Sequence, residues 1–497
     1  MRRLAALVLA GAWSLAAQPL DEARVDRMVR EALAAWRVPG VAVAIVRGDQ
    51  VVYLKGHGVR KLGEPDPVTP DSLFQIASTS KAFTTTALAM LVEEGKISWD
   101  DPVRQHLEHF RLADPLANEN VTVRDLVTHR TGMPRHDSLW YKTGLSREEV
   151  IRRLGEAKAN KQFRQEYQYH NIQFLAAGEL AGKVSGGTWD DFVRARIFAP
   201  LGMKNTTTRF AEATARADRA WPHRRLPDAT NAAIEWVNFE NVGGAGCINS
   251  SARDLAQWIR LHLGGGVFEG QRLIATKNLE ETYAPQMVIR PDARGRQLLP
   301  AHTQRSYAMG WWIDHYRGQY LLTHSGSLDG FRAMVTLAPE HKLGIVVLAN
   351  LGPTLLPAAL SNALLDHLTG LPPRDWNAEL LGVVKRHDEE DAAKKTARLT
   401  KRNAASTPTL KLASYAGSFR APGYGVLRVN LADGALMIES LTHRAALQHY
   451  QYDTFSVASG SPTHPHPLGD EELTFRIDAD GAVASVQFLN TEFRRTP

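Results

Sequence analysis

The sequence predicts an α+β protein of two folded units: a larger domain in which helices cover an antiparallel sheet on both faces, as in an αβα sandwich, and a small C-terminal β-barrel. Three observations support this prediction. β-Branched runs occur within 41–54 and again within 320–348, helical patterns fill the residues between them, and short alternating runs with glycines at the turns follow residue 410. A chain of 497 residues also exceeds what one compact domain usually holds.

The strands of the predicted sheet come from two distant parts of the chain. Residues 41–46 and 51–54 flank the turn residues Gly48 and Asp49, which indicates a hairpin. Three later runs have the same strand character: 320–323, 331–337 and 343–348. One antiparallel sheet that joins all five runs would bring the two parts of the chain together.

Helical patterns dominate the residues between these strands. Ala, Leu and Met recur at helical spacing from 78 to 94, and Gly95 fits a C-cap. A mostly helical lobe is expected at about 100–265, where Ser146 and Glu149 predict a capping box at the start of one helix. The lobe is then an insertion into the sheet domain, so we expect a cleft where lobe and sheet meet.

Composition divides the chain into four segments. Arg2 and Arg3, an apolar stretch and small residues at 14–17 have the order of a secretory signal, so the mature protein is expected to be secreted or periplasmic. About twelve apolar residues are too few to cross a bilayer core of about 30 Å, and we expect no transmembrane segment in the mature chain. The expected segments are a signal peptide at 1–17, the sheet-containing domain at 18–372, a charged helical linker at 373–409 and the β-barrel domain at 410–497.

The charge of the chain argues against nucleic acid as a partner. A net charge of +6 arises from 59 basic and 53 acidic residues, which are spread along the sequence. The one dense basic stretch, 394–402, follows the acidic run 388–391, a pattern typical of a solvated helix face. The sequence does not predict an oligomeric state.

Ser78 and Lys81 form the pattern S-x-x-K at the start of the predicted buried helix. A spacing of three places the serine hydroxyl beside the lysine amine on one face. Serine is a weak nucleophile near neutral pH, and an amine that loses its proton on burial can act as the base that activates it. For this motif alone, an N-capping serine followed by a surface lysine is the alternative interpretation.

Tyr169 and Asn171 form a second motif, Y-x-N, where a polar stretch meets an apolar run, as in a loop that enters a helix. With S-x-x-K upstream, the sequence resembles class C β-lactamases, penicillin-binding proteins and related D-aminopeptidases. The resemblance implies that Tyr169 faces the Ser78 and Lys81 pair and is the general base, alone or together with Lys81. A phenol has a pKa of about 10, so this role requires a nearby cation. Asn171 would hold a substrate amide.

His324 and Gly326 follow a predicted strand where the same families carry K-T-G. The resemblance implies that Gly326 lets substrate lie against the strand edge. It also implies that the backbone N–H groups of Ser78 and Ser327 form an oxyanion hole, in which each donor contributes about 3 kcal/mol. A lysine would attract a substrate carboxylate, whereas a histidine is mostly neutral at pH 7, so His324 favours a peptidase or esterase over a β-lactamase.

Three further strings occur in the order expected for these families: L-V-T-H-R-T-G-M-P at 126–134, G-G-A-G-C-I-N-S-S at 243–251 and M-G-W-W at 309–312. Together they imply the β-lactamase/transpeptidase-like fold for the larger domain. S-Y-A-G-S-F at 414–419 opens a region that resembles the small lipocalin-like β domain appended to some of these hydrolases.

Metal and cysteine chemistry are not predicted. His464 and His466 form the tightest histidine pair, but spacing identifies no third ligand. Cys247 is the only cysteine, and its place in a glycine-rich segment is more typical of packing than of a nucleophile. We expect neither a metal nor another cofactor.

The sequence therefore predicts a serine hydrolase that forms an acyl-enzyme on Ser78 and acts on a peptide, amide or ester, as a D-peptidase, an aminopeptidase or an esterase. Its expected partner is a small-molecule or peptide substrate. Two alternatives remain: a β-lactamase, and a catalytically silent protein that binds or senses peptidoglycan. The presence of Ser78, Lys81 and Tyr169 together favours the enzyme.

Overall fold

A computed structural model describes residues 20–496 and contains one eight-stranded antiparallel sheet in its larger domain. The predicted hairpin pairs with the last strand of the domain, from Val41 opposite Ala349 to Arg47 opposite Leu343. This pairing joins the two distant parts of the chain, as expected. The strands lie in the order β2 (Gln50–Gly58), β1 (Gly40–Arg47), β14 (Leu343–Ala349), β13 (Phe331–Ala338), β12 (Gln319–Leu328), β11 (Trp312–Tyr316), β10 (His302–Tyr307) and β9 (Met287–Val288).

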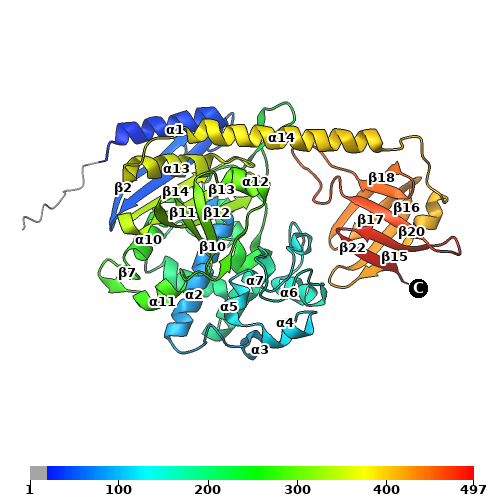
Figure 1. The fold of residues 1–497 in the computed structure, drawn as a ribbon, viewed down its shortest axis with the longest axis horizontal. Coiled ribbons are helices and arrows are strands. Elements are labelled where there is room, and N and C mark those ends of the chain that lie inside the picture. The colour runs from blue at the N-terminus through cyan, green and yellow to red at the C-terminus, as the bar shows by residue number, and fades with distance from the viewer. Residues whose placement is uncertain (1–19, 497) are drawn as a thin grey trace, which may run out of the picture.

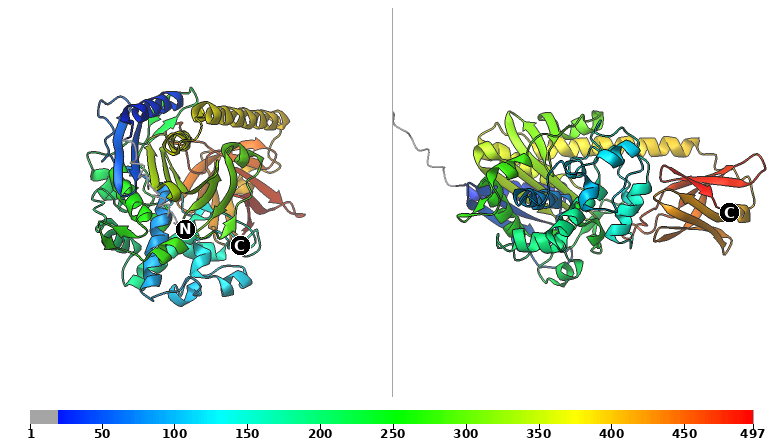
Figure 2. Two further views of the ribbon diagram at one scale, coloured as in Figure 1. Left: turned by 60° about the vertical axis from the view of Figure 1, so that its left-hand side comes forward. Right: turned by 90° about the horizontal axis from the view of Figure 1, so that it is seen from below.

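The sheet is buried on both faces, which makes the domain a three-layer αβα sandwich. In β1, Val41, Val43 and Ile45 enter one hydrophobic core, whereas the intervening alanines enter the other, because successive strand side chains point to opposite faces. The first core lies under α1 (Glu22–Trp36), α13 (Leu356–Thr369) and the start of α14 (Trp376–Lys401). Figures 1 and 2 show these helices along one side of the sheet.

The opposite face of the sheet carries the helical lobe. Helix α2 (Ser80–Glu93) is buried from Ser80 to Leu91, and α10 (Ala252–Leu263) packs on β1 and β14. The other helices on this side are α3 (Val103–His106), α4 (Pro115–Asn120), α5 (Val123–Leu126), α6 (Arg147–Glu156), α7 (Asn171–Ser185), α8 (Trp189–Val193), α9 (Phe210–Ala215) and α11 (Thr276–Glu281). Helix α12 (Ala293–Leu298) instead packs against α14. Three short pairs of strands complete it: β3 (Phe74–Gln75) with β6 (Asn249–Ser250), β4 (His223–Arg225) with β5 (Asn231–Ala233), and β7 (Val267–Phe268) with β8 (Gln271–Arg272).

The capping box predicted at the start of α6 forms only in part. The Ser146 hydroxyl accepts a hydrogen bond from the Glu149 N–H at 3.2 Å, as expected for an N-cap. The Glu149 carboxylate instead accepts hydrogen bonds from Arg152 and Arg153. Charge-assisted bonds to two guanidinium groups are stronger than one to a backbone N–H, which explains why the second half of the box is lost.

Helix α14 leads from the larger domain to a closed barrel, and Figure 1 shows it passing from above the sheet towards the barrel. Its residues 388–401 are exposed, which agrees with the solvated face expected there. A short helix, α15 (Leu412–Tyr415), precedes the barrel, and pairing of Phe419 with Arg495 closes it. Its strands are β15 (Gly417–Ala421), β16 (Gly425–Ala432), β17 (Ala435–Ser440), β18 (His443–Gln451), β19 (Thr454–Val457), β20 (Glu472–Ile477), β21 (Val483–Phe488) and β22 (Thr491–Arg495).

The predicted signal peptide at 1–17 lies outside the described residues. Among residues 20–496, no helix is both long and apolar enough to cross a bilayer.

Candidate active site

Ser78 lies on a tight turn that presents it to solvent. Ala77 has the left-handed φ of 51°, and the 3-10 turn Ala77–Thr79 continues directly into α2. Between Ser72 and Leu91, Ser78 is the only residue that is not buried. The turn thus exposes one hydroxyl from an otherwise buried segment.

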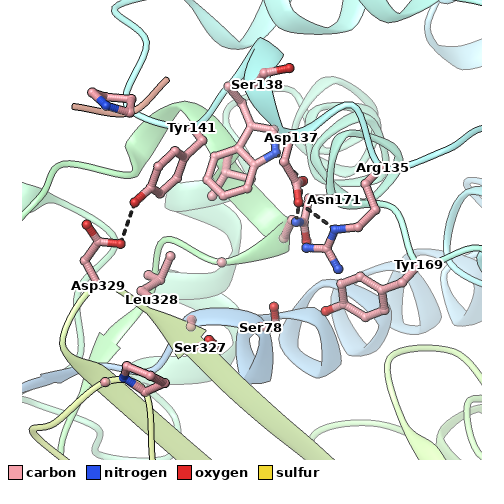
Figure 3. Close-up of a pocket in the computed structure, with 18 of the residues that line it drawn as sticks. Ser78, Arg135, Asp137, Ser138, Tyr141, Tyr169, Asn171, Ser327, Leu328 and Asp329 are labelled. Carbon is pink, nitrogen blue, oxygen red and sulfur yellow. Dashed lines mark hydrogen bonds and ion pairs between the residues drawn. The ribbon is translucent and has the colours of Figure 1, made fainter. Parts of the chain in front are cut away.

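Gly326 allows β12 to pack directly on this turn. A Cβ atom at position 326 would lie 2.1 Å from the carbonyl oxygen of Ile76, so any side chain would push the strand away from Ser78. Contact with the nucleophile turn is therefore one structural reason for glycine at this position. The approach of substrate to the strand edge, expected from the sequence, stays a prediction. Ser327, one residue along β12, is exposed beside Ser78 (Figure 3). This is the position expected for the second N–H of an oxyanion hole.

The Lys81 amine is fully buried and has three oxygen neighbours. It donates hydrogen bonds of 2.8 Å to Asn171 Oδ1 and to the carbonyl oxygen of Ala245, and 3.2 Å separates its Nζ from Ser78 Oγ. Burial, together with the positive charge of Arg135, lowers the pKa of Lys81 well below its ordinary value, whereas Asp137 acts in the opposite direction. A neutral amine has two hydrogens and one lone pair, which matches two acceptors and one hydroxyl.

The glycine-rich string at 243–251 brings the Ala245 carbonyl to this amine. At Gly244, a Cβ atom would lie 2.6 Å from the Thr84 hydroxyl oxygen, and the Gly178 Cα is 3.3 Å away. The Gly244 carbonyl accepts a hydrogen bond from that hydroxyl. The segment fits between α2 and α7 because its glycines have no side chain there.

Tyr169 is placed beside the same amine. Its ring centre is 4.8 Å from Lys81 Nζ and 4.3 Å from the centre of the His129 ring. His129, part of the string at 126–134, accepts a hydrogen bond from the His170 N–H at 3.0 Å and so fixes the backbone of the Y-x-N motif. Burial raises the pKa of Tyr169 above its usual value, although the Ser78 hydroxyl acts in the opposite direction. The resting phenol is therefore protonated at neutral pH.

Two charged residues that the sequence analysis did not assign complete the cluster. The Asp137 carboxylate accepts hydrogen bonds from Asn171 Nδ2 at 3.0 Å and from Arg135 Nε at 2.6 Å. The Arg135 guanidinium lies 5.1 Å from the centre of the Tyr169 ring. Both residues follow the string at 126–134, but neither forms a recognisable motif with a residue that it contacts. Figure 3 shows this network around the pocket.

His324 lies beneath the pocket and does not line it. Its ring is fully buried and stacks on Trp312 with 4.3 Å between ring centres. Nδ1 donates to the carbonyl oxygen of Ser325 at 2.8 Å, and Nε2 accepts from the Tyr307 hydroxyl at 3.2 Å. Burial lowers the pKa of His324 to about 3, so the ring is neutral and supports the pocket wall rather than binding an anion.

Cys247 is buried and close to this site. Burial raises the pKa of its thiol to about 12, although Arg147 acts in the opposite direction. A protonated, buried thiol is not a nucleophile, in agreement with the packing role expected for it. Among residues 20–496, no three His, Cys, Asp or Glu side chains are grouped as metal ligands would be.

The cluster opens into a pocket of about 980 Å³. Ser78, Tyr169, Asn171 and Ser327 line it, and the Ser78 and Tyr169 hydroxyls point into the same space (Figure 3). Trp312, from the string at 309–312, also lines the pocket. The structure therefore gathers one nucleophilic hydroxyl, one buried amine and one phenol at a cavity large enough for a small organic ligand.

Comparison with known proteins assigns this arrangement to a family. The family model described as Beta-lactamase matches residues 25–369, and a model described as "Domain of unknown function (DUF3471)" matches residues 401–496. The chain is 30% identical to the Unguisins hydrolase ungD of Aspergillus violaceofuscus over 456 residues, which cover 84% of this chain and 78% of that protein. It is 25% identical to Protein flp of Staphylococcus aureus over 353 residues, which cover 70% of this chain and 66% of that protein.

Solved structures show the same fold. The octameric penicillin-binding protein homologue from Pyrococcus abyssi superposes with a TM-score of 0.62 at 21% identity, covering 95% of this chain and 100% of that one. The D-amino acid amidase from Ochrobactrum anthropi SV3 superposes with a TM-score of 0.59 at 21% identity, covering 70% of this chain and 99% of that one. With its larger domain matched almost throughout by the family model, this chain belongs to the beta-lactamase family and is a serine hydrolase.

Proposed function

We propose that the protein hydrolyses peptide or amide bonds through an ester on Ser78, with Lys81 as the base that activates the nucleophile. The observation that carries this proposal is the set of three neighbours around Lys81 Nζ. Asn171 and Ala245 take its two hydrogens, so its lone pair is left for the Ser78 hydroxyl 3.2 Å away. Burial lowers the pKa of Lys81 well below its ordinary value, which favours the neutral amine that a base requires.

The proposed acylation step balances as follows. Ser78 Oγ attacks the substrate carbonyl carbon and gives its proton to Lys81 as the new C–O bond forms. The protonated Tyr169 phenol gives its proton to the leaving nitrogen as the C–N bond breaks. Lys81, 4.8 Å from the Tyr169 ring centre, then returns a proton to the phenolate. Tyr169 is thus proposed as the acid of this step, and Lys81 as the base; the sequence left the base role with Tyr169 alone or shared between Tyr169 and Lys81.

The second half of the reaction uses Lys81 as base again. Water attacks the ester carbonyl carbon and gives its proton to the neutral Lys81; as the C–O bond to Ser78 breaks, Lys81 passes that proton to Ser78 Oγ and is neutral again. The N–H groups of Ser78 and Ser327 are proposed to stabilise the oxyanion in both halves, at about 3 kcal/mol each. Asn171 keeps its position against Lys81 throughout, because its amide nitrogen is bonded to Asp137.

Peptides and amides are the favoured substrates because of the edge of β12. Strand β11 pairs with β12 only as far as Thr323, whereas β13 continues along its other edge to Leu328. The N–H and C=O groups at 324–328 that do not pair with β13 can therefore pair with an extended substrate on the β11 side. The names of two similar proteins, an Unguisins hydrolase and a D-amino acid amidase, agree with hydrolysis of this kind. A β-lactam is less favoured, since the neutral His324 does not supply the charge that a lysine would give at this position.

Covalent labelling tests the proposal. The wild-type protein should gain the mass of one fluorophosphonate adduct, and peptide mapping should place it on Ser78. Ser78→Ala should remain unlabelled, whereas Ser325→Ala, which alters another pocket serine, should label normally. Absence of label on the wild type, together with no turnover of p-nitrophenyl acetate, would show that the protein is not an active hydrolase.

We also propose that the protein is exported. The support is the order of Arg2 and Arg3, the apolar stretch and the small residues that follow. N-terminal sequencing of the protein recovered from outside the cytoplasm should begin at residue 17 or 18. A mature protein that retains Met1 would contradict this proposal.

A further inference from the structure

The C-terminal barrel forms part of the wall of the active-site pocket. Five pocket-lining residues come from its loops and strand ends: His443, Pro467, Leu468, Glu471 and Leu489. Leu468 is buried, and Leu489 stands on a two-residue turn between β21 and β22 at which Phe488 pairs with Thr491. Both turn residues have positive φ values, as in the tight hairpin turns that follow the twist of the strands. The turn therefore holds Leu489 in a defined place.

Specific contacts hold the barrel against the helical lobe. The Tyr424 hydroxyl is 2.9 Å from His136 Nδ1, and Tyr424 is only 4% exposed. The Gly423 N–H donates to the Glu156 carboxylate at 3.2 Å, and its carbonyl oxygen accepts from Arg153 at 3.3 Å. A Cβ atom at Gly423 would lie 2.7 Å from the Arg153 carbonyl oxygen, so the two domains meet without room for a side chain. Figure 2 shows the barrel beside the helical lobe.

A second cavity, of about 960 Å³, continues from the pocket between the two domains. Its walls are the loop 134–138 and residues 157–160 on one side, and residues of β15 and β22 with their neighbours on the other. Five residues line both cavities and so form the neck between them: Arg135, Asp137, Ser138, Glu471 and Leu489. The cavities together form one groove that runs from Ser78 along the domain boundary.

We propose that this groove binds an extended peptide, with the reacting carbonyl at Ser78 and several residues on one side of the scissile bond passing between the 135–138 loop and the Leu489 turn. This inference rests on the proposed function. Each cavity alone has the size of a site for one small organic ligand, so the pair exceeds what the amide of one amino acid would fill. The barrel would then select substrates by length.

The charges along the groove suit a peptide better than an apolar chain. The second cavity carries Arg420 and Arg494 together with Glu492, and the neck carries Arg135 opposite Glu471. Donors and acceptors on both walls can pair with peptide N–H and C=O groups. A fatty acyl chain would leave these groups without partners as it displaced water, which is unfavourable.

Rates on substrates of increasing length test this inference with the full-length protein. One substrate is the ester p-nitrophenyl acetate. The others contain one to five alanines, in one series all D and in the other all L. Each series is prepared both as p-nitroanilides and as internally quenched peptides that extend beyond the scissile bond. In the series that is hydrolysed, kcat/KM should rise about tenfold or more with length, because contacts remote from the reacting bond lower the transition-state barrier. The rate on p-nitrophenyl acetate should not depend on the groove.

Two variants that fill the neck, Leu489→Trp and Glu471→Trp, should lose most of this gain, measured in each variant as the ratio of kcat/KM on the longest substrate to kcat/KM on p-nitrophenyl acetate. Leu431→Trp is the matched control, because Leu431 is exposed on β16 and lines neither cavity. A kcat/KM that does not change with length in either series, or a gain that survives in both neck variants, overturns the inference. Failure both to hydrolyse p-nitrophenyl acetate and to label Ser78 would overturn the proposed function first, and this inference with it.

Discussion

Asn171 Nδ2 donates a hydrogen bond to the Asp137 carboxylate at 3.0 Å, and this contact decides which way the Asn171 amide faces. A carboxylate accepts hydrogen bonds and cannot donate one, so the amide nitrogen must point to Asp137 and the amide oxygen to Lys81. Through Asn171, Asp137 thereby orients the hydrogens of the Lys81 amine, although Asp137 is not itself one of the reacting groups. It also affects the amine by its charge.

We predict opposite pH shifts when the two charges near Lys81 are removed. The neutral amine is the active form, so the rate should rise with pH through the pKa of Lys81. Asp137→Asn removes a charge that raises this pKa, and the rising limb of kcat/KM should move to lower pH. Arg135→Met removes a charge that lowers it, and the limb should move to higher pH. Profiles of kcat/KM from pH 4 to 10 give both limbs; shifts in the same direction would contradict the assignment of Lys81 as base.

Tyr169→Phe should impair amide hydrolysis far more than ester hydrolysis. A leaving amine needs a proton, whereas p-nitrophenolate leaves without one, so the acid matters for the amide alone. We expect a loss of about 10²–10⁴-fold on an amide or peptide, and a much smaller loss on p-nitrophenyl acetate. Lys81→Met, in contrast, should reduce both rates, since both substrates require activation of Ser78. Equal losses on both substrates in Tyr169→Phe would place Tyr169 as the base instead.

Gly326→Ala should separate β12 from the nucleophile turn. The new Cβ would lie 2.1 Å from the Ile76 carbonyl oxygen, and overpacking of this kind costs about 1–3 kcal/mol. Thermal unfolding should show a lower Tm, and the rate of fluorophosphonate labelling of Ser78 should fall. Gly187→Ala is the control: a Cβ at Gly187 meets no atom within 4 Å and its φ is not positive. A variant at 326 as stable and reactive as this control would refute the packing role.

His262 should make the protein less stable in acid. It lies outside the active-site cluster, between Trp258 and Trp311, and burial lowers its pKa to about 3. In the unfolded chain its pKa is about 6.5, so between these values the unfolded state binds one more proton and stability falls as the pH drops. Urea unfolding of the wild type should show this slope between pH 4.5 and 5.5.

His262→Phe removes the titrating group and keeps an aromatic ring beside the two tryptophans. The slope of unfolding free energy against pH should decrease by about 1.4 kcal/mol per pH unit in this range. The slope is the diagnostic quantity, because a loss of packing would lower stability equally at all pH values. His315→Phe, on the exposed side of β11, should leave the slope unchanged within error. An unchanged slope in His262→Phe would show that His262 is protonated in the folded protein.

Periodicity and spacing were enough to predict the sheet, the buried helix and the contact between Ser78 and Lys81. The β-branched run at 41–46 predicted a strand, and the structure shows why it is apolar throughout: both faces of β1 enter a core. The separation of Ser78 and Lys81 by three residues specified their contact, because one helical turn fixes it locally. Tyr169 and Asn171 could be placed beside them only through resemblance to a family.

Residue types and their spacing fix which reactive groups are present and which of them share a helical turn. The protonation of these groups and their surroundings depend on how distant segments pack: a backbone carbonyl, that of Ala245, binds Lys81, and no residue type marks such a group in a sequence. Burial lowers the pKa of Lys81 and raises that of Tyr169. The extent of this desolvation depends on every element that packs around the two side chains. The barrel wall at Leu489 also depends on the way two domains dock, which local patterns do not encode.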